Sequence, residues 1–276
     1  MSLKMILPTL STLALVLAPA AIALDEYMPV PVRVMQINAG FDRTSISGNF
    51  DGAWENDERE NSENPLAIPV QGKFGVLENL EGSMAASYLI NDSSGNTGLD
   101  RPVLALKYAD PTHGGGGFLA ISLPVGFEDI MNAGNFATMT FGAMYGKQFP
   151  MVGLLANLSY SFNTEDNLKN KIDNLRFYAK PEYVIPAPFL VNKKQRLGAS
   201  LAGIYEYHFN RMEAGESIDV GAHLFQLVPG LLYTVNKIVS AEVNAYFNVS
   251  GQNQPAGSRV RAQLYFSLEE DVYNAL

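Results

Sequence analysis

Charged side chains recur at alternate positions in several segments of this 276-residue chain, and they are the residues best suited to binding or selecting a ligand. Alternate side chains of a β-strand share one face, so Arg259 and Arg261 would point the same way. Rings of charge on the inside of a pore select and orient solutes. The same groups could instead pair with one another and fill a narrow interior. The candidate pore-lining residues are Lys73, Lys107, Arg176, Lys180, Glu182, Glu206, His208, Asp219, His223, Glu242, Arg259, Arg261 and Glu269.

The histidines are the residues around which an enzyme would be built. His208 and His223 lie on neighbouring expected strands, near Glu206 and Asp219, and could form a general base and the group that orients it. No G-x-S-x-G or H-E-x-x-H motif accompanies them, and the chain lacks the His-x-Ser expected of a twelve-stranded outer-membrane phospholipase. We therefore expect no enzyme, no cofactor and no metal, and interpret these histidines as members of an interior hydrogen-bond network.

The segment NKIVSAEVNAYFNVSG, residues 236–251, shows how such groups would be positioned. Its apolar residues alternate strictly with polar ones, which predicts a strand with one oily and one wet face. The oily face is Val239, Ala241, Val243, Ala245, Phe247 and Val249, and Glu242 lies in the middle of the other face.

Twelve segments have this period of two and are bounded by turn residues. They lie near residues 31–40, 67–78, 82–91, 102–109, 116–126, 136–148, 151–163, 174–186, 196–209, 218–234, 238–250 and 258–268. The connections between them alternate between long polar loops, the first of which spans residues 41–65, and mostly tight turns. This pattern predicts an all-β fold, an up-and-down antiparallel barrel of about 12 strands with its long loops at one end.

The placement of charge within the strands indicates which side of the barrel meets water. Apolar faces about ten residues long, with charged groups at mid-strand on the opposite face, fit a barrel that is turned outward to lipid. A soluble barrel or sandwich could show similar alternation, but it rarely needs twelve strands of this length. We therefore predict a transmembrane barrel.

The first 23 residues resemble a secretory signal peptide. Lys4 gives the positive start, an apolar run follows, and Ala21-Ile22-Ala23 offers a cleavage site, so we expect a signal peptide at 1–23 and an outer-membrane barrel at 24–276. The chain has no cysteine, so no disulfide holds it. Removal of Lys4 leaves 18 basic and 28 acidic residues, a balance that argues against nucleic acid as a partner.

The stretch RPVLALKYADPTHGGGGFLAISLPVGFED, residues 101–129, resembles the outer-membrane barrels associated with meta-pathway phenol degradation. Members of that family pair an alternating strand with a Leu-Pro-x-Gly exit, here Leu123-Pro124-Val125-Gly126. The resemblance implies a solute channel without fixed catalytic residues. The C-terminal EEDVYNAL departs from the terminal aromatic residue that the outer-membrane assembly machinery usually meets.

Together these patterns predict a channel in the bacterial outer membrane for passive uptake of small solutes, hydrophobic or aromatic ones among them. The alternatives are a non-conducting structural or adhesive barrel and, less favoured, a barrel enzyme. The expected partners are outer-membrane lipid and lipopolysaccharide, the small-molecule solute and the assembly machinery.

Overall fold

The computed structural model describes residues 29–50, 56–63, 65–90, 97–110, 112–123, 137–163, 173–186, 195–209, 212–213, 216–217, 221–252 and 254–269. Within these ranges no helix has the length and apolar character needed to cross a membrane.

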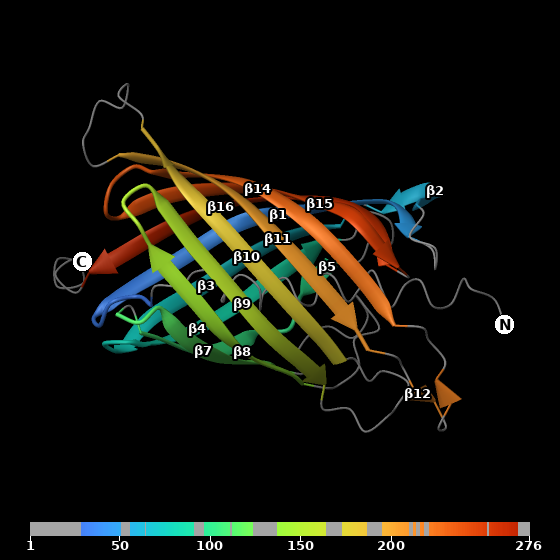
Figure 1. Cartoon of the computed structure of the whole chain (residues 1–276), viewed down its shortest axis with the longest axis horizontal. Helices are drawn as coiled ribbons and strands as arrows, with labels where there is room; N and C mark the ends of the chain where they lie inside the picture. Colours follow the sequence, from blue (N-terminus) through green and yellow to red (C-terminus); the bar gives the residue numbers. More distant parts are fainter. Residues whose placement is uncertain are drawn as a thin grey trace.

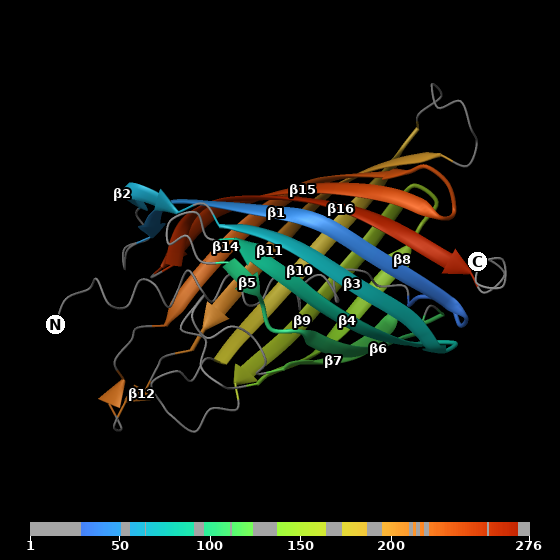
Figure 2. The same ribbon diagram turned by 180° about the vertical axis from the view of Figure 1, so that it is seen from behind.

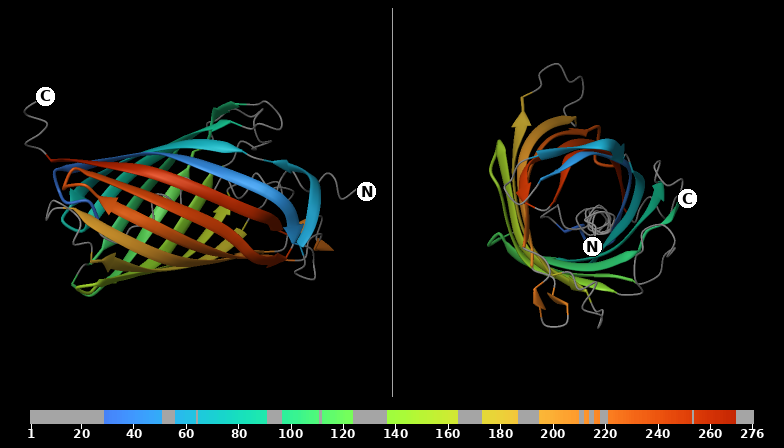
Figure 3. Two further views of the ribbon diagram at one scale, coloured as in Figure 1. Left: turned by 90° about the horizontal axis from the view of Figure 1, so that it is seen from above. Right: turned by 90° about the vertical axis from the view of Figure 1, so that its right-hand side faces the viewer.

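Twelve antiparallel strands close into a barrel (Figures 1 and 2). They are β1 (Val34–Phe50), β3 (Leu66–Leu77), β4 (Leu80–Ile90), β6 (Val103–Ala109), β7 (Gly115–Ser122), β8 (Thr138–Gln148), β9 (Val152–Asn163), β10 (Asp173–Ile185), β11 (Arg196–His208), β14 (Ala222–Thr234), β15 (Val239–Gln252) and β16 (Gln254–Glu269). Each strand pairs with the next, and β16 pairs with β1 along its length, so the ring has no free edge. The end-on view in Figure 3 shows this ring, and the expected fold is confirmed.

Short strands extend the barrel at the end that carries the long connections. β2 (Asn56–Glu63) pairs with the end of β1, and β5 (Thr97–Leu99) pairs with the end of β4. β12 (Met212–Glu213) and β13 (Glu216–Ser217) form a separate two-stranded sheet in the connection from β11 to β14. This end of the barrel therefore carries the additional structure.

The predicted boundaries lie within a few residues of the observed ones for most strands, but the predicted end of the first strand, at residue 40, was wrong. β1 continues from residue 40 to Phe50, a stretch that we expected to be an external loop. Asp42 and Ile46 are buried there, while Phe41 and Arg43, on either side of Asp42, are exposed. Polar side chains inside the barrel made this half of the strand look like a loop in the sequence.

Alternation of burial separates the two faces of the wall. In β15, Glu242 and Asn244 are buried, while Val243 and Phe247 are 48% and 47% exposed on the outside. The same pattern runs through β6, where each outward residue is exposed and each inward residue is buried. An apolar outer surface around a polar interior is the arrangement of a barrel in lipid.

Polar side chains cap the tight turns at the opposite end. Asn236 Oδ1 accepts hydrogen bonds from the N–H groups of Ile238 and Val239, each at 2.8 Å, and so fixes the turn from β14 to β15. Between β6 and β7, Asp110 accepts hydrogen bonds from Thr112 and His113. The side-chain bond with His113, followed by that from the Thr112 N–H, holds the pKa of the Asp110 carboxyl below its usual value.

Candidate functional site

The inner wall has two parts of different chemistry. We call the inner faces of β7, β8 and β9 the plain sector, because their described residues include no charged side chain. The plain sector is built from residues such as Phe118, Ala120, Met144 and Leu155. The remaining strands, from β10 around to β6, form the charged sector. The candidate site lies on this second part of the wall.

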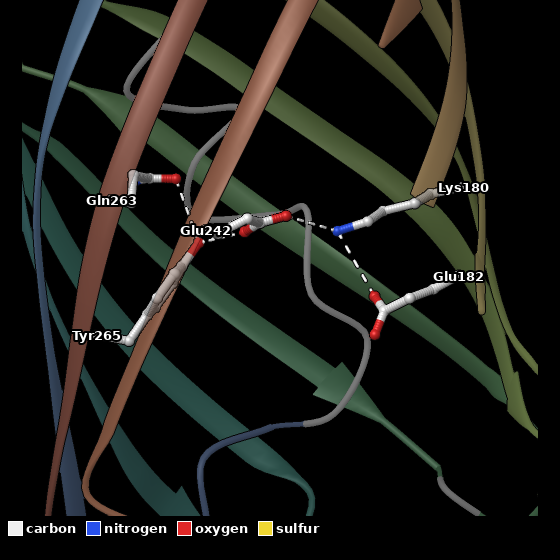
Figure 4. A network of polar contacts seen from close by, with 5 residues as sticks. All are labelled: Lys180, Glu182, Glu242, Gln263 and Tyr265. Carbon is white, nitrogen blue, oxygen red and sulfur yellow. Dashed lines mark hydrogen bonds and ion pairs between the residues drawn. The ribbon is translucent and has the colours of Figure 1, made fainter. Parts of the chain in front are cut away.

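Lys180 on β10 reaches across β11 and β14 to Glu242 on β15 (Figure 4). Its Nζ lies 2.9 Å from Glu242 Oε1 and 3.8 Å from Glu182 Oε2. The Tyr265 hydroxyl donates to Glu242 Oε2 at 2.6 Å and lies 3.2 Å from Gln263 Oε1. Two carboxylates thus share one ammonium, which leaves this part of the wall with an acidic excess.

A glycine makes room beneath this bridge. Ser200, Gly230 and Asn244 are direct neighbours across β11, β14 and β15. A Cβ on Gly230 would lie 2.6 Å from Ser200 Oγ and closer still to the Asn244 side chain, so no other residue fits without displacement. The resulting recess in the wall is lined by Tyr178, Lys180, Ser200, Ala202, Val228, Glu242, Asn244, Tyr246, Arg261, Gln263 and Tyr265.

Two arginines on β16 share one carboxylate on β1. Arg261 donates to Asp42 Oδ2 from Nε at 2.9 Å, and its Nη2 lies 2.8 Å from the same oxygen. Arg259 Nε lies 3.5 Å from Asp42 Oδ1. The Arg259 guanidinium lies over the Tyr246 ring, 4.0 Å from its centroid, in a cation–π contact. This group therefore has a basic excess.

A second basic group lies near the end that carries the long connections. Arg176 Nε is 3.3 Å from Glu206 Oε1, as the pairing of β10 with β11 brings these residues opposite each other. His208 Nε2 is 3.8 Å from Glu206 Oε2. The cross-strand pairing that we expected between these strands is thus present for Arg176 and Glu206.

The segment that precedes β1, from Val30 to Arg33, lies against the inner wall at the short-turn end. Lys107 Nζ lies 3.0 Å from Glu81 Oε1, and both side chains are buried. Glu81 Oε2 also accepts a hydrogen bond from the Val30 N–H at 2.8 Å. Gly75 permits this approach, because a Cβ there would lie 2.6 Å from Val30 O. Arg33, with φ of 66°, then turns the chain into β1.

His223 is the one described candidate that the structure places on the wrong face. Its neighbours Ala222 and Leu224 are buried inside, whereas His223 lies on the outer face and contacts the rings of Tyr205 and Tyr207. The Tyr205 hydroxyl is hydrogen-bonded to His223 Nδ1. The prediction failed because apolar and polar residues do not alternate cleanly in this segment, and His223 lies one residue out of step with the inward positions.

Outward aromatic rings continue from His223 across the neighbouring strands. Phe141, Tyr160, Phe162, Tyr207 and Phe209 form a chain of ring contacts with centroid separations from 4.9 to 6.4 Å. Aromatic girdles of this kind mark the interface between membrane and water. His223 therefore belongs to a girdle, and it lies on the opposite face of the wall from His208, so the interior hydrogen-bond network that we expected for these histidines does not include His223.

The other predicted residues are placed as follows. Lys73 is buried on the inner face of β3, opposite Gln36 and Ser83. Asp219 and the side chain of Glu269 lie outside the described residues. Among the described residues, no group of three or more His, Cys, Asp or Glu side chains could hold a metal ion.

Sequence reasoning missed three acidic members of the interior. Asp42 was assigned to a loop and Glu81 to a turn, although both continue the alternation of their strands. Asp100 lies in the short link between β5 and β6, which carries one residue more than the facing part of β4. Burial raises the pKa of Asp100 to about 6, although the N–H of Arg101, at 2.7 Å, and the charge of Arg101 oppose this rise.

Comparisons with known proteins give structural relatives only. No family model matches the sequence, and no curated protein matches it. An outer membrane channel from Pseudomonas putida F1, described as COG4313, is similar in structure with a TM-score of 0.72 at 10% identity, over 88% of this chain and 98% of that one. The β domain of the Bordetella autotransporter Brka has a TM-score of 0.52 at 9% identity, over 86% of this chain and all of that one.

The closed ring, the exposed apolar outer face and the polar interior define the class. The chain has the fold of bacterial outer-membrane β-barrels, with twelve strands in its wall. The structural neighbours share this architecture at about 10% identity, so the residues of the inner wall must be interpreted on their own chemistry.

Proposed function

We propose that this protein is a passive channel in the bacterial outer membrane for small solutes. The observation that carries the proposal is the charged sector, a set of ionised side chains on the inner face of a closed barrel whose outer face is apolar. Twelve strands give a lumen between the packed interior of an eight-stranded barrel and the open channel of a sixteen-stranded one. The structural similarity to a protein described as an outer membrane channel supports the proposal.

Single-channel recording of the refolded, full-length mature protein in a planar bilayer tests this function. We expect discrete conductance steps in potassium chloride. A protein that inserts but produces neither steps nor swelling of liposomes would support the alternative, a structural or adhesive barrel.

The residues that would line the path are those found on the inner face. They are Lys73, Lys107, Arg176, Lys180, Glu182, Glu206, His208, Glu242, Arg259 and Arg261 from the sequence prediction, to which the structure adds Asp42 and Glu81. Because these groups lie in pairs, the pore would have only weak ion selectivity.

The solute class that we favour is small hydrophobic or aromatic molecules. Two apolar clusters in the inner wall support it, one containing Phe118 and Met144 and the other containing Leu155, Ile204 and Val228. Liposome swelling with benzyl alcohol and with a sugar of similar mass tests this choice. Equal or faster entry of the sugar would remove the support for a hydrophobic solute.

The proposal includes removal of residues 1–23 and assembly of residues 24–276 in the outer membrane. Outer-membrane lipid, lipopolysaccharide and the assembly machinery would then be its partners, and the resemblance to meta-pathway barrels stays a prediction. Cell fractionation and N-terminal sequencing test it, with a mature start at Leu24 expected in the outer membrane. Recovery as a soluble periplasmic protein would contradict the lipid-facing assignment.

A further inference from the structure

We propose that Arg259 is a docking position for small organic carboxylates on the inner wall. This inference rests on the proposed channel function and names the chemistry of one class of solute.

Two contacts hold the Arg259 guanidinium in place. Its Cζ lies over the Tyr246 ring, 4.0 Å from the centroid, and Tyr246 is directly opposite Arg259 in the pairing of β15 with β16. Its Nε faces Asp42 Oδ1 at 3.5 Å, too far for a well-formed hydrogen bond. An arginine held in this way keeps its orientation without using its terminal nitrogens.

The two terminal nitrogens of Arg259 make no hydrogen bond or ion pair within the described residues. They form a planar pair of donors, the geometry that matches the two oxygens of a carboxylate. The side chain is 17% exposed, so it is reachable from the lumen. Arg259 is therefore pre-oriented for a bidentate anion.

The charge around Arg259 also favours an anion. Arg259 and Arg261 share Asp42, and the adjoining pair is Arg176 with Glu206. Within the contacts described for this group, three guanidinium groups face two carboxylates, so the group has a basic excess. One carboxylate brought by a solute would balance it in a wall of low dielectric, where such pairing is strengthened.

The apolar surroundings restrict the solute further. Tyr246 belongs to an apolar cluster with Tyr178, Ile204 and Val228. A carboxylate attached to a compact apolar body can contact both the guanidinium and this apolar surface, whereas an inorganic anion can use only the guanidinium. The class is therefore a small aromatic or aliphatic monocarboxylate, and benzoate is a suitable probe.

The test measures how benzoate blocks potassium chloride conductance through the full-length mature channel, with benzyl alcohol as a neutral probe of the same shape. We expect benzoate to block at a lower concentration than benzyl alcohol. Arg259→Gln should raise the half-blocking concentration of benzoate about tenfold, since a charge-assisted hydrogen bond contributes roughly that factor. For Arg259→Lys, the half-blocking concentration of benzoate should lie between those of the wild type and Arg259→Gln, because an ammonium keeps the positive charge but lacks the paired donors of a guanidinium.

Arg43→Gln is the matched control, because Arg43 is an exposed residue of the adjacent strand β1 and faces away from the lumen. It removes the same charge and should leave benzoate block unchanged. The inference would be overturned if benzoate and benzyl alcohol blocked equally. It would also be overturned if Arg259→Gln left the half-blocking concentration of benzoate unchanged, or if Arg43→Gln raised it as much as Arg259→Gln does.

Calorimetry separates this inference from the channel proposal. Benzoate should bind the detergent-solubilised wild type and bind Arg259→Gln about tenfold more weakly. Binding of benzoate without any conductance would support the docking position and contradict the channel. Conductance without benzoate binding would support the channel and contradict the docking position. A thermal unfolding curve for each variant checks that the barrel is intact.

Discussion

The plain sector and the charged sector belong to one barrel, but different constraints hold their interiors together. In the plain sector, contacts are neutral and join adjacent strands, as between Thr140 Oγ1 and Ser161 Oγ at 2.8 Å. In the charged sector, Lys180 pairs with Glu242 across two intervening strands, and Arg261 pairs with Asp42, 219 residues away. The plain sector needs only correct neighbours, whereas the charged sector also contains pairs, those of Asp42, that form only when β16 meets β1.

Closure matters because a buried charge without its partner is costly. The β1–β16 seam brings Asp42 to the two arginines, and it forms only when the two ends of the chain meet. The charged sector therefore ties the polar interior to the completed barrel. The plain sector does not depend on closure of this seam. Substitutions in the two sectors can therefore be compared directly.

The largest expected effect comes from breaking a buried pair at the short-turn end of the charged sector. Glu81→Gln leaves Lys107 without its carboxylate and weakens the contact with Val30, so the free energy of unfolding should fall by about 3–5 kcal/mol. Urea unfolding in detergent micelles measures it. Ala120→Ser, on the plain sector, should cost about 1 kcal/mol, and equal losses would show that the two sectors do not differ.

Next in size is the contrast between the two faces of β15. Val243→Arg places a charge on the outer surface and should cost about 2–4 kcal/mol in a lipid bilayer, because Val243 is 48% exposed there. Asn244→Arg points into the charged sector and should cost much less. Unfolding titrations in phospholipid vesicles compare them, and the reverse order would mean that the assigned faces are exchanged.

Much of this comparison could be predicted from the sequence. The period of two predicted twelve strands and correctly placed Glu242 inside and Val243 outside, and the alternation of connections predicted the up-and-down order of the strands. Position on a face is local, so a local pattern suffices. The ion-pair partner of a side chain is not determined locally. Nothing near Arg261 in the chain identifies Asp42, because β16 pairs with β1 only when the barrel closes.

The failures have equally specific reasons. His223 lies in a segment where apolar and polar residues do not alternate cleanly, so its face could not be decided by period alone. The second half of β1 has polar inward residues and resembled a loop, which hid Asp42. The shift of one residue between β5 and β6 is a feature of strand pairing, and it buries Asp100 without a signal in the sequence.

Asp100, beside the plain sector, gives a smaller effect that depends on pH. Its folded pKa of about 6 lies above the ordinary value of 3.8, so the protonated form is favoured by folding. The stability that it contributes is present below about pH 4 and is lost as pH rises through 6, by up to about 3 kcal/mol. Asp100→Asn should remove this loss. Other carboxyl groups titrate in the same range, so the difference between wild type and variant, measured by urea unfolding from pH 4 to 7, is the relevant quantity.

The smallest expected effect is on ion selectivity, and it asks whether the charged sector lies on the conduction path. Changing Arg259 and Arg261 together to Gln removes two positive charges and leaves Asp42 as an unpaired carboxylate facing the lumen. The reversal potential in a salt gradient should shift towards cations by several millivolts, because charges in a low-dielectric wall act strongly on passing ions. The shift should shrink as ionic strength rises. Replacing Arg43 on the outer face gives a control in which the shift should be absent. Unchanged selectivity in a conducting double variant would mean that ions pass along the plain sector, and the division of the wall would then describe stability alone.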